Sequence, residues 1–238
     1  IHMAKPEWKI LNITIESHAS GLFCVAFPTA TRRCEMDYLK YLVEEIHSTV
    51  MATVDKSSLP VTCAIDMMDY DENGLYFLTA KGKNLYERLK QKGYVALTGM
   101  KGNDTLSCVA ISVRGKAEEI GNKPLDRLLE KNAYMKEIYP TKESRKALTV
   151  FRIYEGNGEW FDLSKKPIER ASFTFGNGIK AVDGYYITDK CIGCKKCKEV
   201  CPQECIDFTN GYARIIQGSC LHCGNCLNIC PVKAVEKL

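Results

Sequence analysis

The sequence lacks the features that would assign it to several common functional classes. No run approaches the roughly 20 apolar residues that cross a bilayer. The best apolar stretch near the N-terminus, Leu22 to Phe27, is too short for a secretory signal. No Ser/His/Asp set, phosphate-binding P-loop or HExxH motif occurs, so hydrolysis and nucleotide-triphosphate chemistry are not supported. These absences favour a cytoplasmic protein that does not associate with a membrane.

Cysteine, in contrast, is abundant near the C-terminus and follows one spacing twice. The runs read C-x2-C-x2-C-x3-C-P and comprise Cys191, Cys194, Cys197 and Cys201, then Cys220, Cys223, Cys226 and Cys230. This spacing is typical of [4Fe-4S] ligation, and the fourth cysteine of each run ligates the other cluster in two-cluster proteins of this type. The prediction is therefore one cluster on Cys191, Cys194, Cys197 and Cys230, and a second on Cys220, Cys223, Cys226 and Cys201.

Other interpretations of these cysteines fit less well. Structural zinc sites use paired C-x2-C units separated by longer gaps, and disulfide frameworks are typical of short secreted chains. The segments 191–206 and 220–235 also align without a gap, as an internal repeat. In that alignment Cys205 falls opposite Ala234. We therefore expect Cys205 to be a small buried residue and not a ligand.

The excess of positive over negative charge is also small, and metal binding would remove it. The formal net charge is +4, which treats every cysteine as neutral. Eight thiolates and two cluster cores of +2 each contribute about −4, so the oxidised holoprotein is expected to be close to neutral. Nucleic acid is therefore not an expected partner.

From Tyr185 to Val235 the sequence resembles the bacterial two-cluster ferredoxins, through the two cysteine runs. The resemblance implies a small α+β two-cluster ferredoxin-like domain over residues 185–238, with the clusters close together. Members of this family pass low-potential single electrons between enzymes. A short glycine-bearing linker, residues 176–184, is expected to connect this domain to the preceding one.

The preceding residues, 36–175, alternate strand-like segments with short helices. Helices are predicted at 36–46 and 84–92, with Gly93 ending the second, and Pro124 opens a third. Strands are predicted at 49–54, 60–65, 75–79, 94–98 and 106–118, with an acidic turn at 69–74. The segments 148–154 and 159–163 are predicted to form a hairpin across Gly156-Asn157-Gly158. This pattern favours a closed or nearly closed barrel. Residues 1–35 show no clear period and remain an unassigned extension.

A second resemblance depends on the segments Val50–Asp55, Leu59–Ala64 and Gly74–Leu85. Their order after a helix is similar to that of the FMN-binding split-barrel family, the pyridoxamine 5′-phosphate oxidase-like superfamily. Over about residues 36–175 the resemblance implies a mainly β split barrel with short helices, which forms a homodimer with FMN bound at the interface. By position, the family's flavin strand corresponds to Pro60, Val61, Thr62 and Cys63, and its phosphate site to Thr79, Lys81, Lys83 and Asn84.

The chain departs from true pyridoxamine phosphate oxidases along the flavin strand. The segment Val61–Asp66 is nearly uncharged, where those enzymes have arginine and lysine. Oxidase activity on a phosphorylated pyridoxamine is therefore not expected. Lys81 and Lys83 could also be ordinary solvated lysines, although a phosphate requires cations near a helix start. Whether Cys63 or Trp160 contacts the flavin stays open, and His222 is expected to be exposed.

Together these patterns predict an iron–sulfur flavoprotein from an anaerobe. The leading hypothesis is an FMN-dependent reductase that takes single electrons from the clusters and reduces a small organic acceptor, supplied by a low-potential donor such as a ferredoxin-like protein or a reductase. One alternative is a non-catalytic electron carrier or redox sensor. Another is a barrel that holds haem, for which His47 would be the available axial residue.

Overall fold

The computed structural model describes residues 36–180, 183–209 and 211–238. The N-terminal extension, residues 1–35, lies outside the described residues, so its assignment stays open. No helix in the described parts of the chain is long and apolar enough to cross a membrane.

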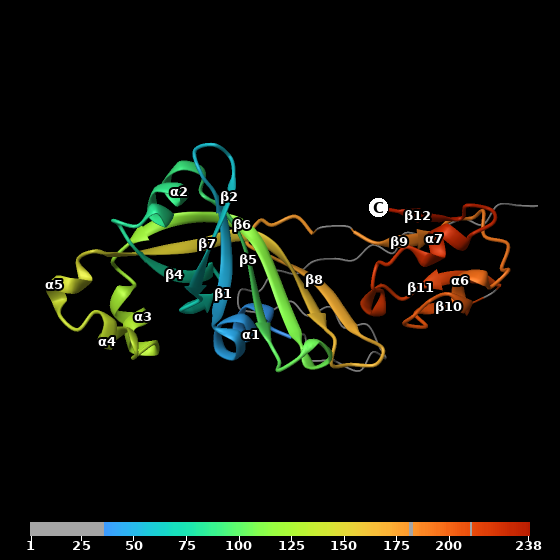
Figure 1. The fold of residues 1–238 in the computed structure, drawn as a ribbon, viewed down its shortest axis with the longest axis horizontal. Coiled ribbons are helices and arrows are strands. Elements are labelled where there is room, and N and C mark those ends of the chain that lie inside the picture. The colour runs from blue at the N-terminus through green and yellow to red at the C-terminus, as the bar shows by residue number, and fades with distance from the viewer. Residues whose placement is uncertain (1–35, 181–182, 210) are drawn as a thin grey trace, which may run out of the picture. The chain divides into compact units, whose positions relative to one another are not determined.

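The first module, which precedes the cysteine runs, is built mainly from antiparallel strands (Figure 1). Its strands are β1 (Ser48–Val54), β2 (Pro60–Asp66), β3 (Asp69–Asp71), β4 (Gly74–Ala80), β5 (Tyr94–Lys101), β6 (Val109–Gly121), β7 (Leu148–Asp162) and β8 (Glu169–Phe175). Its helical elements are α1 (Tyr38–Tyr41), η1 (Leu42–Ile46), α2 (Asn84–Lys92), η2 (Thr105–Ser107), α3 (Leu125–Lys131), α4 (Met135–Ile138) and α5 (Lys142–Arg145).

One long strand, β7, organises the sheet. The strands follow the order β2-β1-β5-β6-β7-β4-β3, and β8 also pairs with β7. The N-terminal half of β7 pairs with β4 and its C-terminal half pairs with β8, while β6 runs along its other side (Figure 1). The sheet therefore divides along β7, and the mainly β split barrel expected from the sequence is confirmed.

The predicted hairpin across Gly156-Asn157-Gly158 is wrong, because these residues lie inside β7. A Cβ at Gly156 would lie 2.5 Å from the Arg114 carbonyl oxygen, and one at Gly158 would lie 2.4 Å from a ring carbon of Phe173. The glycines therefore allow the close approach of β6 and of a β8 ring, and they do not make a turn. Composition does not distinguish these two uses of glycine.

The acidic turn predicted at 69–74 is shorter than expected. Asp69–Asp71 form β3, which pairs with β4, and only Glu72 and Asn73 connect the two strands. Asp69 is 1% exposed and its carboxylate contacts Arg127 and Lys131 of α3. Pairing with two cations on a neighbouring helix explains why an acidic residue can be buried in a strand here.

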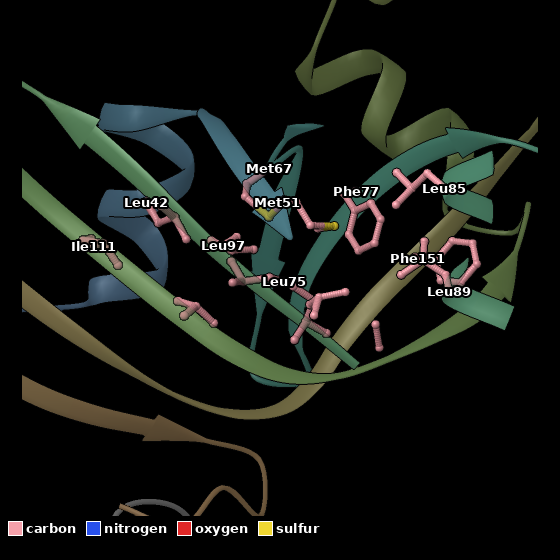
Figure 2. Close-up of a cluster of buried hydrophobic side chains, with 14 of the residues drawn as sticks. Leu42, Met51, Met67, Leu75, Phe77, Leu85, Leu89, Leu97, Ile111 and Phe151 are labelled. Carbon is pink, nitrogen blue, oxygen red and sulfur yellow. The ribbon is translucent and has the colours of Figure 1, made fainter. Parts of the chain in front are cut away.

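Two apolar clusters cover opposite faces of β4 and β7. Leu75 and Phe77 pack with Phe151 in the cluster drawn in Figure 2, which also contains Leu42 from η1 and Met51 from β1. Tyr76 and Leu78 point to the other face, where the second cluster includes α3. Burial on both faces explains the continuous apolar run of β4, which otherwise would alternate with polar residues.

The predicted helix 84–92 is confirmed, and it shows how local sequence sets an element boundary. Gly93 follows α2 with a φ of 53°, in the left-handed region that favours glycine at the end of a helix. Leu85 and Leu89 bury one face of α2 in the first cluster. The N-terminus of α2 is thereby held beside the end of β4.

The C-terminal module is a small α+β unit, as the resemblance to the two-cluster ferredoxins implied. Its elements are β9 (Tyr185–Ile187), α6 (Lys196–Glu199), β10 (Ile206–Thr209), β11 (Tyr212–Ile215), η3 (Gln217–Ser219), α7 (Asn225–Ile229) and β12 (Val235–Lys237). β10 pairs with β11 and β12 pairs with β9, both antiparallel. Each of the helices α6 and α7 contains the third cysteine of its run.

Candidate cofactor sites

The predicted cluster ligands surround two separate cavities in the C-terminal module. One cavity is lined by Cys191, Cys194, Cys197 and Cys230. The other is lined by Cys201, Cys220, Cys223 and Cys226. Each set contains three cysteines of one run and the last cysteine of the other run. The structure thus brings together the same two groups of four that the spacing predicts.

The backbone of the two runs follows the same path, which places the sulfurs. Gly193 and Lys195 have φ values of 67° and 64°, and their counterparts in the repeat, His222 and Gly224, have φ values of 55° and 81°. Positive φ at these alternate positions curls the chain, so that successive cysteines face inward. A non-glycine residue occupies one such position in each run, so each cysteine loop holds one residue in a strained backbone conformation.

The donor set fits a cluster better than a single metal ion. Among the described residues, no three His, Cys, Asp or Glu side chains converge closely enough to hold one ion. Four sulfurs spread around a cavity instead suit a larger polynuclear group. Apolar side chains complete each wall, including Ile187 and Phe208 on one side and Ile206 and Ile215 on the other. A dry wall of this kind lowers solvent access to the bound group.

The thiol groups differ in how readily they ionise. Burial raises the pKa of Cys226 to about 11 and also raises the pKa of Cys197. Burial acts in the same direction on Cys230, but hydrogen bonds from backbone amides outweigh it and lower the pKa of this thiol. The amide of Ala234 donates one of these bonds, at 3.2 Å. Metal binding requires deprotonation, so cluster assembly would release protons from the buried cysteines.

The sequence predictions for two further residues of the cysteine loops had different outcomes. Cys205 is buried, as predicted, and its sulfur lies 3.5 Å from that of Cys201. Burial is the main cause that raises the pKa of the Cys205 thiol. His222 was expected to be exposed, and this is wrong, because only 14% of its side chain is exposed. The ring of Tyr185 lies edge-on to it, and burial lowers its pKa.

In the barrel, the predicted flavin strand β2 divides its residues between two faces. Pro60 and Thr62 are exposed on the outer face, whereas Val61 and Cys63 are half-buried on the inner face. Cys63 packs against the first apolar cluster, and burial raises the pKa of its thiol. Only the outward residues of this strand are therefore available for side-chain contact with a ligand on the outer face.

The predicted phosphate residues lie where β4 ends and α2 begins. Lys81, Lys83 and Asn84 are exposed, and Lys83 is the N-cap residue of α2 without a side-chain capping bond. Lys83 therefore gives the first amides of this nine-residue helix no side-chain acceptor, although the Tyr86 amide donates to the Lys83 carbonyl. Together with two lysines, such a terminus fits a phosphate group. Thr79 is buried, and its hydroxyl has no hydrogen-bond partner within the described residues.

One cation of this region was missed by the sequence analysis. Arg88 donates a 2.7 Å hydrogen bond to the Thr53 hydroxyl, and its charge and that of Lys83 act on the Cys63 thiol. Arg88 follows Asn84 by four residues, so helical spacing places it one turn along the same face. That spacing was the available signal.

The outer face of the sheet forms an open groove along β1, β5, β6 and β7. Its floor combines small or apolar side chains, such as Val50 and Ala96, with polar ones. The hydroxyls of Thr98 and Ser112 are 2.9 Å apart, and Arg114 Nε donates to the Asn157 side-chain oxygen at 3.0 Å. Thr62 of β2 also lines the groove. A flat ring could lie on such a floor and find hydrogen-bonding groups at its edge.

Two other residues that were candidates for ligand contact already interact with other residues of the chain. Trp160 is 4% exposed and packs edge-on against Tyr41, which supports a role in the core. His47 Nε2 is 2.8 Å from the Tyr134 hydroxyl, which in turn donates to Asp66. A metal at this nitrogen would displace the hydrogen bond to Tyr134, so the haem hypothesis gains no support from His47.

Comparisons with known proteins identify both modules. The sequence model of the pyridoxamine 5′-phosphate oxidase family matches residues 36–155, and that of the 4Fe-4S dicluster domain matches residues 190–234. No curated protein matches the chain.

Several solved structures resemble part of the chain. A NimC/NimA family protein from Clostridium acetobutylicum has a TM-score of 0.48 and 16% identity, over 58% of this chain and 94% of that one. A protein from the same organism, related to general stress protein 26 of B. subtilis, has a TM-score of 0.44 and 18% identity, over 58% and 96%. A pyridoxamine 5′-phosphate oxidase-related, FMN-binding protein from Nostoc punctiforme PCC 73102 has a TM-score of 0.41 and 12% identity, over 63% and 100%.

The match to the pyridoxamine 5′-phosphate oxidase model covers just over half of the 238 residues, and it includes the strands from β1 to the first half of β7 and the α2 terminus. The second covers both cysteine runs. The chain therefore belongs to the pyridoxamine 5′-phosphate oxidase family, and it carries a C-terminal 4Fe-4S dicluster domain.

Proposed function

We propose that this protein is an FMN-dependent reductase, in which two [4Fe-4S] clusters supply single electrons to FMN for the reduction of a small organic acceptor. The observation that carries the proposal is the pair of four-cysteine cavities in a chain whose first module belongs to a flavin-associated family. An iron–sulfur cluster exchanges one electron at a time, whereas flavin can store two and pass them on together. The combination suits conversion between one-electron and two-electron chemistry.

The α2 terminus supports the phosphate end of this proposal. Lys81 and Lys83 supply positive charge, and the uncapped amides of α2 supply hydrogen-bond donors at the same place. Arg88 adds a further cation one turn along the helix. The proposed role of these groups is to hold the phosphate of FMN, which fixes one end of the cofactor relative to β2.

The outer groove supports a place for the ring. Thr62, Thr98 and Ser112 offer hydroxyls, and the small side chains of Ala52 and Ala96 line the same groove. Arg114, held by Asn157, supplies positive charge on the same surface. An open sheet face of this kind covers only one side of a flat ligand, so the second wall is proposed to come from a second copy of the chain in a homodimer.

The electron donor is proposed to be a low-potential protein such as a ferredoxin or a reductase, because clusters of this type commonly operate at low potential. Oxygen-dependent oxidation of a pyridoxamine phosphate is not proposed. The strand segment Val61–Asp66 contains no lysine or arginine to bind a second phosphate.

Anaerobic purification followed by iron, sulfide and flavin counting tests the proposal first. Two four-iron clusters and one FMN per chain are expected. Rapid mixing of the reduced protein with candidate acceptors should then show cluster oxidation together with flavin turnover. Protein without flavin, or cluster oxidation with no matching flavin reduction, would contradict the proposal. Flavin reduction with no acceptor turned over would favour the electron carrier.

The phosphate site has a matched pair of variants. Lys83→Ala should weaken FMN binding about 10-fold or more, the size expected for one charge-assisted hydrogen bond. Lys92→Ala removes a lysine from the opposite end of α2 and should change the affinity by less than about twofold. Fluorescence titration of the flavin-free protein measures both. Equal effects of the two substitutions would show that only general positive charge matters.

A further inference from the structure

The two cysteine cavities differ in their number of sulfur atoms, because of one position of the internal repeat. Cys205 lines the cavity of Cys201 and Cys220, whereas its counterpart, Ala234, lines the other cavity. Cys205 is not among the four expected ligands of its cavity, and only 3% of the residue is exposed. One of two otherwise similar cavities therefore contains a fifth sulfur.

The sulfur of Cys205 lies beside the sulfur of a predicted ligand. Its Sγ lies 3.5 Å from Cys201 Sγ, within hydrogen-bond distance for sulfur. The Cys205 carbonyl accepts a 2.8 Å hydrogen bond from the Ile216 amide, and the next residue, Ile206, is buried in β10. The backbone on both sides of the thiol is thus fixed.

The direction of the hydrogen bond follows from the chemistry of ligation. A cysteine that binds a cluster does so as a thiolate, which accepts hydrogen bonds and donates none. A cysteine that binds no metal keeps its proton at neutral pH when it is buried in apolar surroundings. With a cluster present, Cys205 is therefore the donor and Cys201 is the acceptor.

We propose that the Cys205 thiol donates an S–H···S hydrogen bond to the Cys201 thiolate and thereby raises the reduction potential of the cluster held by Cys201, Cys220, Cys223 and Cys226. The inference rests on the proposed function, because it requires that this second cluster is present. Reduction adds negative charge to a cluster and its sulfurs, so a donor beside a ligand stabilises the reduced form more than the oxidised form. Ala234 has no such donor.

The consequence is a contribution to the difference in reduction potential between the two clusters, although both halves of the module share one fold. The hydrogen bond favours residence of the electron on the cluster beside Cys205. A chain with two clusters and a fixed difference between them has a preferred order of electron transfer. Cys205 is not itself a ligand. It acts on the reduction potential of the cluster through its hydrogen bond to the ligand Cys201.

EPR-monitored redox titration of the full-length, anaerobically purified holoprotein tests this role. Cys205→Ala should keep the iron content of the wild type. At the potential where the affected wild-type cluster is half reduced, its ratio of reduced to oxidised form should fall about two- to tenfold, as expected for one net hydrogen bond. The other cluster should not change. Cys205→Ser keeps a donor at this position and should stay within about twofold of the wild type.

The control is Cys108→Ala, which removes another buried thiol, one that lies in the barrel. It should leave both clusters unchanged. Equal shifts in Cys205→Ala and Cys205→Ser would indicate packing and overturn the inference, as would no shift in Cys205→Ala. Loss of iron in Cys205→Ala would make Cys205 a ligand and overturn it also. A wild-type protein that contains only one cluster fails the iron count before any variant is made, and this outcome refutes the proposed function itself.

Discussion

The barrel and the C-terminal module are held together by different means. The buried members of the first barrel cluster are aliphatic, aromatic or methionine side chains, such as Leu75, Phe77 and Phe151 (Figure 2). In the C-terminal module, the buried cluster is smaller, and Cys205, Cys220 and Cys226 belong to it. Cys220 and Cys226 are predicted ligands, and four other predicted ligands pack against this cluster. The first barrel cluster is apolar, whereas the cluster of the C-terminal module borders two cavities lined with sulfur.

The difference shows how far each module can depend on its own side chains. A β-rich module with two apolar clusters buries enough surface to fold without a cofactor. A segment of about 54 residues with little apolar interior usually needs a metal or disulfides to be stable. We therefore expect the stability of the C-terminal module to depend on the iron and that of the barrel to be independent of it.

Removal of the iron should break this comparison most strongly. Anaerobic chelation is expected to unfold residues 185–238, because the free energy of metal binding is also folding free energy in small metal-binding domains. Residues 36–175 should keep their structure. Limited proteolysis followed by mass spectrometry measures both regions in one sample. Protection of the C-terminal module after complete loss of iron would contradict the expectation.

A substitution that creates a cavity in the barrel core should have the opposite effect: it should destabilise the barrel and leave the iron in place. Phe77 is fully buried, so Phe77→Ala should lower the free energy of unfolding of the barrel by about 3–5 kcal/mol. The iron content per folded chain should not change. Chemical denaturation of the barrel measures the first effect and iron analysis the second.

Met100→Ala is the matched control, because 66% of this side chain is exposed. It should change the free energy of unfolding by less than about 0.5 kcal/mol. A loss of iron in Phe77→Ala without loss of soluble protein would show that the two modules are energetically coupled.

The smallest expected effect concerns the carboxylate of Glu119, a half-buried residue of the barrel. Burial opposes ionisation of Glu119, but hydrogen bonds from Thr149, Lys90 and Tyr86 outweigh it and lower its pKa. A carboxyl whose pKa is lowered by folding stabilises the fold above its unfolded pKa and loses this contribution as the pH falls through the folded pKa. Glu119→Gln should therefore cost about 1 kcal/mol at neutral pH.

The pH dependence separates this effect from general packing. The difference in free energy of unfolding between wild type and Glu119→Gln should shrink as the pH falls below about 4. Urea denaturation at several pH values measures it. The control Glu143→Gln removes an exposed carboxylate that pairs with Lys146 and should show almost no difference at any pH. A Glu119→Gln difference that is constant with pH would contradict the electrostatic explanation.

Most of the strands, the helix 84–92 and the composition of the two cysteine sets were predictable from the sequence. These features depend on local periodicity, on a glycine that ends a helix, and on a cysteine spacing with few other uses. The Gly156-Asn157-Gly158 hairpin was not predicted correctly, because glycine serves both turns and close strand contacts. The burial of His222 was also missed, since its neighbours in space come from elsewhere in the chain.

The sequence by itself determined that this chain has two modules, that the second presents two groups of four cysteines, and that cations lie near the start of a helix. Each of these facts is written in residue type and spacing along the chain. Only the tertiary structure decided which residues of β2 face outward, that Arg88 joins Lys83 near Cys63, and that Cys205 contacts Cys201 while Ala234 offers no sulfur to the other cavity. These relations depend on strand pairing and on packing between distant segments, which local spacing does not encode.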